Sequence, residues 1–250
     1  MGGHHQDNPT PCAGGKARFA PTRWTIVLAA AEGQSATHAR RALEELAQTY
    51  WFPLYAYIRR VGHRSPEAED LTQEFFAHLI EKQSLASADR TKGRFRSFLL
   101  TSVKNFLANE WDKTHAKKRG GGARLISLDA LDAEARYTIE PVDNMTPERI
   151  FEQRWARAIL DRVLARLRQR YEQKHRARLF DVLKSALVSH GDETSHAAMA
   201  TQLEMSSSAL AVAVHRLRRR YRDLLRDEIA QTVASPELVE EEINYLLHCL

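Results

Sequence analysis

The chain is poor in cysteine. Its 250 residues include only Cys12 and Cys249, which lie near opposite ends. This spacing provides neither a disulfide framework nor a set of metal ligands, and it is typical of a protein kept in a reducing compartment. We therefore predict a cytoplasmic protein with no structural metal.

Long apolar segments are missing as well. The longest apolar run near the start covers residues 24–31, far short of the ~20 residues that a membrane-spanning helix needs. No basic segment followed by a cleavage site of small residues precedes it, so we expect neither export nor membrane insertion. The 11 glycines and 8 prolines are too few for a fibrous or low-complexity chain, and 43% apolar with 28% charged residues is ordinary for a folded protein.

Apolar residues recur at helical spacings of three and four, and no alternating strand pattern competes with them. Helix starts are expected at Ser65-Pro66 and Thr146-Pro147, and a further helix at about 97–113. After a pause at 190–193, two shorter helices precede a long arginine-rich one. The pattern predicts an all-α fold of two helical domains joined by a flexible linker. The expected division is a disordered tail at 1–21, a first domain at 22–115, a linker at 116–147, a second domain at 148–234 and an acidic C-terminal helix at 235–250.

Charge is segregated along the chain. Lysine and arginine exceed acids by 37 to 32 overall, but residues 65–82 have a net charge of −4 and residues 90–119 one of +7. Residues 215–226 hold six arginines and one aspartate, whereas residues 227–250 hold six acids and no base. Solvated helix faces are the simplest explanation of any one block. The repeated alternation counts against that explanation for the blocks taken together, and the overall basic excess permits a nucleic-acid partner without requiring one.

Residues 195–210 have the layout of a helix-turn-helix. Leu203, Leu210 and Val214 would pack its two helices together, and Ser206 would cap the second helix. The N-terminal part of such a helix presents small polar groups to base edges, and following arginines neutralise phosphates. A plain helical hairpin is the alternative.

Two motifs of the chain resemble the bacterial sigma-70 family of RNA polymerase specificity factors, in its extracytoplasmic-function (ECF) group. Residues 68–79, AEDLTQEFFAHL, are similar to the region 2.2 motif of that family, AEDLVQEVFLRL. Residues 95–105 are similar to its region 2.3 to 2.4 pattern, with Phe98 where the family has tryptophan, and the helix-turn-helix corresponds to region 4.2. The resemblance extends over about 38–232.

The resemblance implies that the helix containing residues 68–79 docks on a basic coiled coil of the largest polymerase subunit. Asp70 and Glu74 are one helical turn apart, so both can meet the same arginine-bearing surface. The alternative is that these acids only face water. The implied contacts with core polymerase are Asp70, Leu71, Gln73, Glu74 and Phe75.

The following helix is implied to capture the minus-ten element of the promoter as it melts, with the loop at 84–96 as the candidate base pocket. Such a site needs cations for the backbone and aromatic or polar groups for unstacked bases. Phe95, Phe98 and Phe106 fit an apolar helix face and are assigned to the core. The implied minus-ten contacts are Arg94, Arg96, Lys104, Asn105, Asn109, Trp111 and Lys113.

The helix-turn-helix is implied to read the minus-thirty-five element in the major groove. The family's usual glycine in its turn is Glu204 here, so the turn departs from the pattern. The implied contacts are Ser207, Ser208, Ala211, Val212, His215, Arg216, Arg218, Arg219 and Arg220.

Promoter DNA and core polymerase are thus the expected partners, and an anti-sigma factor or other regulatory protein is a further one that the sequence leaves open. The sequence holds no glycine-rich phosphate loop and no nucleophile motif, so we expect no enzymatic activity and no cofactor. A helix-turn-helix regulator that acts without core polymerase is the alternative function. The acidic C-terminal helix has three open interpretations: simple packing, folding back on the arginines of the second domain, or binding a regulator.

Overall fold

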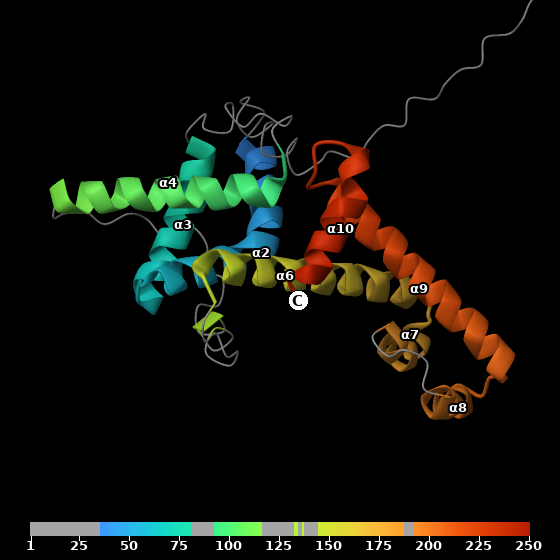
Figure 1. Ribbon diagram of the computed structural model, residues 1–250. Coiled ribbons are helices and arrows are strands. Elements are labelled where there is room, and N and C mark those ends of the chain that lie inside the picture. Colours follow the sequence, from blue (N-terminus) through green and yellow to red (C-terminus); the bar gives the residue numbers. More distant parts are fainter. Residues whose placement is uncertain (1–35, 82–92, 117–132, 135–136, 138–144, 188–192) are drawn as a thin grey trace, which may run out of the picture.

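The computed structural model describes residues 36–81, 93–116, 133–134, 137, 145–187 and 193–250. All regular elements within these ranges are helices, which confirms the all-α prediction (Figure 1). The predicted tail at 1–21 and most of the predicted linker lie outside the described residues. Within these ranges, no helix is long and apolar enough to cross a membrane.

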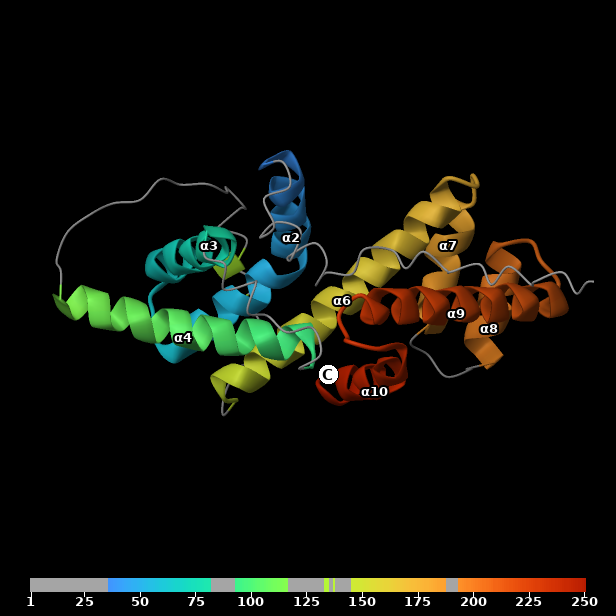
Figure 2. The same cartoon turned by 90° about the horizontal axis from the view of Figure 1, so that it is seen from above.

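The first group of helices consists of α2 (Ala36–Val61), α3 (Ser65–Glu81) and α4 (Phe95–Ala116). Helix α2 contains Pro53, which lacks an amide hydrogen, and the helix bends part-way along its length (Figure 2). Aromatic contacts join the three helices: the ring of Tyr50 lies 5.3 Å from that of Phe95, and Phe75 lies 5.7 Å from Phe106. Phe95 and Phe106 are buried, as predicted.

Helix α6 (Pro147–Glu172) is shared by both halves of the molecule. It packs against α2 and α4 on one side and against α7 and α9 on the other, and it runs through the middle of the molecule (Figure 2). Trp155 and Ile159 on α6 are fully buried in the same apolar cluster as Leu54 of α2. Thr146 caps α6 by accepting a hydrogen bond from the amide of Arg149, which confirms the predicted start.

The second group consists of α7 (Ala177–Leu183), the 3-10 helix η3 (Lys184–Leu187), α8 (Glu193–Gln202) and α9 (Ser207–Ala230). The amide of Ala209 donates to the hydroxyl of Ser206, which confirms the predicted cap of α9. The prediction of a separate arginine-rich helix after the second short one is wrong. Helix α9 continues without a break through all the arginines, because its buried stripe of Leu210, Val214 and Leu217 extends to Ile229.

The start of α3 differs from the sequence pattern. Ser65 lies inside the first turn of α3, and its hydroxyl contacts the side chains of Tyr55 and Glu69.

In the turn between α8 and α9, Glu204 has a φ of 53°. This left-handed backbone favours glycine, the residue that the family pattern has at this position.

The chain ends in η4 (Pro236–Leu238) and α10 (Val239–His248). Helix α10 packs against both α9 and α6. It buries Val239, Glu242 and Leu246. The acidic C-terminal segment is therefore part of the packed molecule, and it lies beside the first residues of α4 (Figure 1).

Candidate polymerase and nucleic-acid interfaces

Helix α3 presents an exposed acidic face. Asp70 and Glu74 are exposed one turn apart, and Leu71 and Gln73 are half-buried beside them. Phe75 is different: it is fully buried, with its ring 6.1 Å from Phe76 and 5.7 Å from Phe106. Phe75 therefore supports the helix from the core side, because its ring is enclosed by other aromatic side chains and presents no surface to a partner.

The beginning of α4 is covered. Arg96 is only 6% exposed, and its Nε donates to Oε1 of Glu242 over 2.7 Å, while its Nη1 lies 3.2 Å from Oε1 of Glu152. Arg94 also pairs with Glu242, with 2.7 Å between its Nε and Oε2, and with Glu241. The sequence predicted both arginines as minus-ten DNA contacts. In this structure their donor groups are occupied by carboxylates of the C-terminal helix.

A ring contact completes the cover of Arg96. The aromatic ring of Tyr245 lies 3.8 Å from its guanidinium carbon, and the Trp155 ring lies 5.4 Å away on α6. Burial by itself would lower the pKa of Arg96, but its hydrogen bonds and charge interaction with Glu242 outweigh burial and raise the pKa. The guanidinium is therefore held in its charged form by this enclosure.

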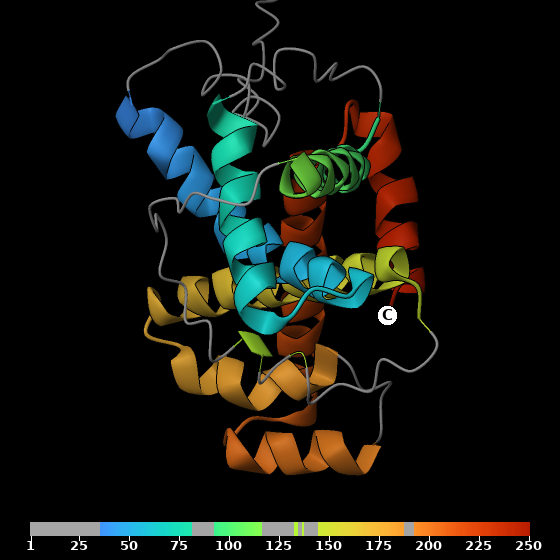
Figure 3. The same cartoon turned by 90° about the vertical axis from the view of Figure 1, so that its left-hand side faces the viewer.

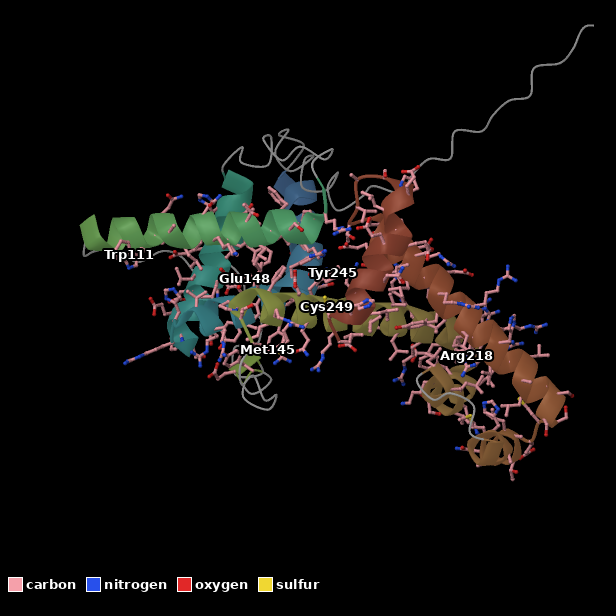
Figure 4. All side chains as sticks on the ribbon, viewed as in Figure 1. Trp111, Met145, Glu148, Arg218, Tyr245 and Cys249 are labelled. Atoms are coloured by element: carbon pink, nitrogen blue, oxygen red, sulfur yellow. The ribbon has the colours of Figure 1, made fainter. Side chains whose placement is uncertain are left out.

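The other end of α4 is open. Asn105, Asn109 and Trp111 are exposed, and Trp111 is 63% exposed where the helix extends past its neighbours (Figure 4). Lys104 is 45% exposed and pairs with Glu148 of α6 over 2.7 Å. The hydrogen bond that Lys104 donates to Glu148 is the main cause of the raised pKa of Lys104. The side chain of Lys113 and most of the predicted base-pocket loop, 84–92, lie outside the described residues.

Helix α9 separates its predicted DNA contacts into two sets. Arg218 donates two hydrogen bonds to the carbonyl oxygen of Ala186, at 3.0 and 2.8 Å, and Arg220 donates to the hydroxyl of Tyr171 over 3.2 Å. These two arginines hold neighbouring helices in place. The exposed residues of the predicted set are Ser207, Ser208, Ala211, Val212, His215, Arg216 and Arg219.

Buried acids are the residues that the sequence did not single out. Glu228 on α9 is 1% exposed and binds Arg162 and Arg166 of α6 at 3.0 and 2.8 Å. Glu242 is fully buried between Arg94 and Arg96. A further paired acid, Glu134, is only half-buried and accepts hydrogen bonds from Arg59 and Tyr55. The excess of acids over residues 227–250 was a signal for the pairs of Glu228 and Glu242, but it does not name their partners.

The first group of helices is similar to a known protein-family domain. Residues 42–116 match Sigma-70 region 2. The match covers most of α2 and all of α3 and α4, which carry the acidic face and both ends of the predicted minus-ten helix. It supports a sigma-70 family sigma factor, and with it RNA polymerase binding and transcription initiation. No curated protein and no solved structure matches the chain.

Proposed function

We propose that this chain is an ECF-group RNA polymerase sigma factor that directs core polymerase to specific promoters in the cytoplasm and promotes DNA opening. The observation that carries the proposal is the Sigma-70 region 2 match over 42–116, together with the exposed acidic pair on α3 within it. Neither promoter binding nor strand separation breaks a covalent bond, so the chemistry belongs to the polymerase.

Docking on core polymerase uses the acidic pair, Asp70 and Glu74. Both carboxylates are exposed on the same side of α3, so they can meet one basic surface of the polymerase without rearrangement of the helix. Opposite charges across an interface accelerate encounter and fix its register. Leu71 and Gln73, half-buried next to the pair, add contact area at the edge of the same face.

Capture of the melted minus-ten strand uses the open end of α4. An unpaired base needs a stacking partner and hydrogen-bond groups to replace those of the duplex. Trp111 offers an exposed ring, and Asn105 and Asn109 offer amides one turn apart on the exposed side of the helix. Lys104 supplies a cation for the backbone if its pair with Glu148 opens.

Recognition of the minus-thirty-five element uses the first turns of α9. Ser207, Ser208 and Ala211 are small and exposed, so the helix can approach base edges in the major groove closely. Arg216 and Arg219 are exposed further along the helix and can neutralise phosphates. Because phosphate contacts release counterions, promoter binding should fall steeply with salt.

Run-off transcription with purified core polymerase tests the proposal. Addition of this chain should produce transcripts with defined start sites from genomic promoter fragments, and core polymerase alone should not. Absence of any defined start, together with no association between the chain and core polymerase, would overturn the assignment.

The second candidate, a helix-turn-helix regulator that works alone, is favoured by the exposed first turns of α9. DNA footprints with and without core polymerase separate the two functions. A regulator protects duplex DNA by itself, whereas the proposed sigma factor protects its promoter only in the presence of core polymerase.

A further inference from the structure

The last 20 residues of the chain, 231–250, close over the start of α4; we refer to them as the C-terminal clasp. Their carboxylates occupy the donors of two arginines that belong to the predicted minus-ten surface. Glu242 is fully buried and accepts hydrogen bonds from Arg96, and it pairs with Arg94 over 2.7 Å. Glu241 pairs with Arg94 from the solvent side.

A carboxylate and a phosphate group compete for the same arginine donors. The planar carboxylate and the tetrahedral phosphate are both oxyanions, and a guanidinium can bind either of them through two parallel hydrogen bonds. The two oxygens of Glu242 lie 2.7 and 3.3 Å from Nε and Nη2 of Arg96. A DNA phosphate therefore cannot reach these donors while α10 is in place.

The clasp also covers the backbone at the start of α4. The amide of Phe95, the first residue of α4, donates to the carbonyl oxygen of Thr232 over 2.9 Å. Free amides at the start of a helix bind anions, because they point outward and the helix dipole adds a partial positive charge. The clasp thus blocks a backbone donor next to the two arginine side chains.

The clasp is fastened on its other side to the second group of helices. Arg226 near the end of α9 pairs with Glu240 over 2.6 Å, and Thr232 is buried with Val233 directly after α9. Viewed along α4, the clasp lies on one side of this helix and α3 lies on the other (Figure 3). The acidic face of α3 consequently stays open while the start of α4 is closed.

We propose that the C-terminal clasp is an autoinhibitory segment that competes with single-stranded promoter DNA for Arg94 and Arg96. The proposal rests on the proposed function. It gives the free protein an open polymerase-docking face and a closed DNA-binding face, so that DNA binding follows release of the clasp. The apparent DNA affinity of the closed protein is reduced by the fraction of molecules in which the clasp is released.

The test compares the full chain with three altered forms by fluorescence anisotropy, with a labelled 20-nucleotide single-stranded DNA of mixed sequence at low salt. The first form ends after Ser235 and lacks η4 and α10, the second is Glu241→Lys, and the third is the control Glu237→Lys. Glu237 is an exposed acid of the same segment that is hydrogen-bonded to Ser235, so its reversal changes the net charge equally without touching Arg94.

We expect truncation after Ser235 to tighten DNA binding at least about 10-fold. Glu241→Lys should tighten DNA binding about 3-fold more than Glu237→Lys does. When Arg94→Gln is added to the truncated chain, most of the gain in DNA affinity should be lost. Circular dichroism confirms that the truncated chain is folded, and Glu241→Lys provides the answer if it is not. Equal DNA affinity of truncated and full chains, or equal effects of the two lysine variants, overturns the inference.

Run-off transcription by the full chain separates this failure from failure of the proposed function. Specific transcripts together with unchanged DNA affinity after truncation would leave a sigma factor whose C-terminal segment only packs. A second measurement uses a synthetic peptide of residues 236–250. It should bind the truncated chain and be displaced by single-stranded DNA; simultaneous binding of peptide and DNA contradicts competition.

Discussion

The two ends of helix α4 carry predicted DNA contacts in opposite states. At its start, Arg96 is 6% exposed beneath the C-terminal clasp, whereas near its end Trp111 is 63% exposed. Both belong to one helix within the Sigma-70 region 2 match. The presence of arginines suited to nucleic acid therefore does not by itself define an accessible DNA-binding surface. Carboxylates from a distant part of the chain can already bind their donor groups.

The acidic face of α3 sharpens the difference. Asp70 and Glu74 are as strongly charged as the two arginines, yet they are exposed, while Arg94 and Arg96 are enclosed by the acids of α10. The free chain thus leaves its predicted polymerase-docking surface accessible and covers two of its seven predicted minus-ten contacts, Arg94 and Arg96.

The largest effect is expected from removal of the buried acid. Glu242→Ala should lower the free energy of unfolding by about 3–5 kcal/mol, because it leaves the charge of Arg96 buried with less compensation. The matched control Glu241→Ala removes a carboxylate that is 64% exposed and should cost at most about 1 kcal/mol. Urea unfolding measures both, and equal losses would contradict the closed state of this end of α4.

Reversal of the acidic pair tests the open face. The double variant Asp70→Lys and Glu74→Lys should weaken binding to core polymerase about 10- to 100-fold, since two attractive charges become repulsive. The control reverses Asp223 and Asp227, two exposed acids on α9, and should change core affinity less than about 3-fold. Titration of labelled chain with core polymerase gives both values, and an unaffected double variant would count against docking through α3.

Truncation of the exposed ring tests the open end of α4. Trp111→Ala should shorten the lifetime of the open promoter complex about 10-fold, because base stacking on an aromatic side chain contributes roughly 1–3 kcal/mol. The unfolding free energy should change by less than about 0.5 kcal/mol. Phe106→Ala provides the contrast: this ring is 3% exposed, so its loss should destabilise the fold by about 3–5 kcal/mol. A long-lived complex with Trp111→Ala would exclude stacking there.

The smallest expected effect is on the ionisation of Tyr245, whose ring lies against Arg96 at the closed end of α4. Burial, followed by the hydrogen bond with Glu152, raises the pKa of Tyr245 to about 12 from its ordinary value of 10.0. Because the folded protein holds this proton more tightly, the resulting stabilisation is complete below pH 10 and is lost as the pH rises through about 12.

Tyrosinate absorbance measures this titration. Tyr55, whose pKa burial also raises to about 12, serves as an internal control in the first group of helices. Tyr245→Phe should remove one late-titrating tyrosine and leave Tyr55 unchanged. Titration of Tyr245 near pH 10 in the folded chain would mean that α10 is not docked.

Local patterns in the sequence account for much of the fold. The caps at Thr146 and Ser206 were predicted because a hydroxyl before an apolar stripe satisfies free amides of the first turn. The exposed acidic pair on α3 followed from a spacing of four residues, which places two side chains on one face of a helix. These predictions depend on residues that are neighbours along the chain.

The covered arginines could not be predicted in this way. Arg96 and Glu242 are 146 residues apart, and helical periodicity carries no information about which helices meet. The sequence suggested that the acidic C-terminal helix could fold back on the arginines of the second domain. The pair of Arg226 and Glu240 confirms this in part. The buried acid of this helix, Glu242, instead binds Arg94 and Arg96 in the first group of helices.

Helix α6 limits how this protein can be divided for study. The proposed second domain begins at 148, with the first turn of α6, yet Phe151, Trp155 and Ile159 of this helix are fully buried in a cluster shared with α2. A fragment that starts at 148 would expose these large apolar side chains to water and would be prone to aggregate. A stable DNA-reading fragment would have to shed the first half of α6 or replace this apolar stripe with polar residues.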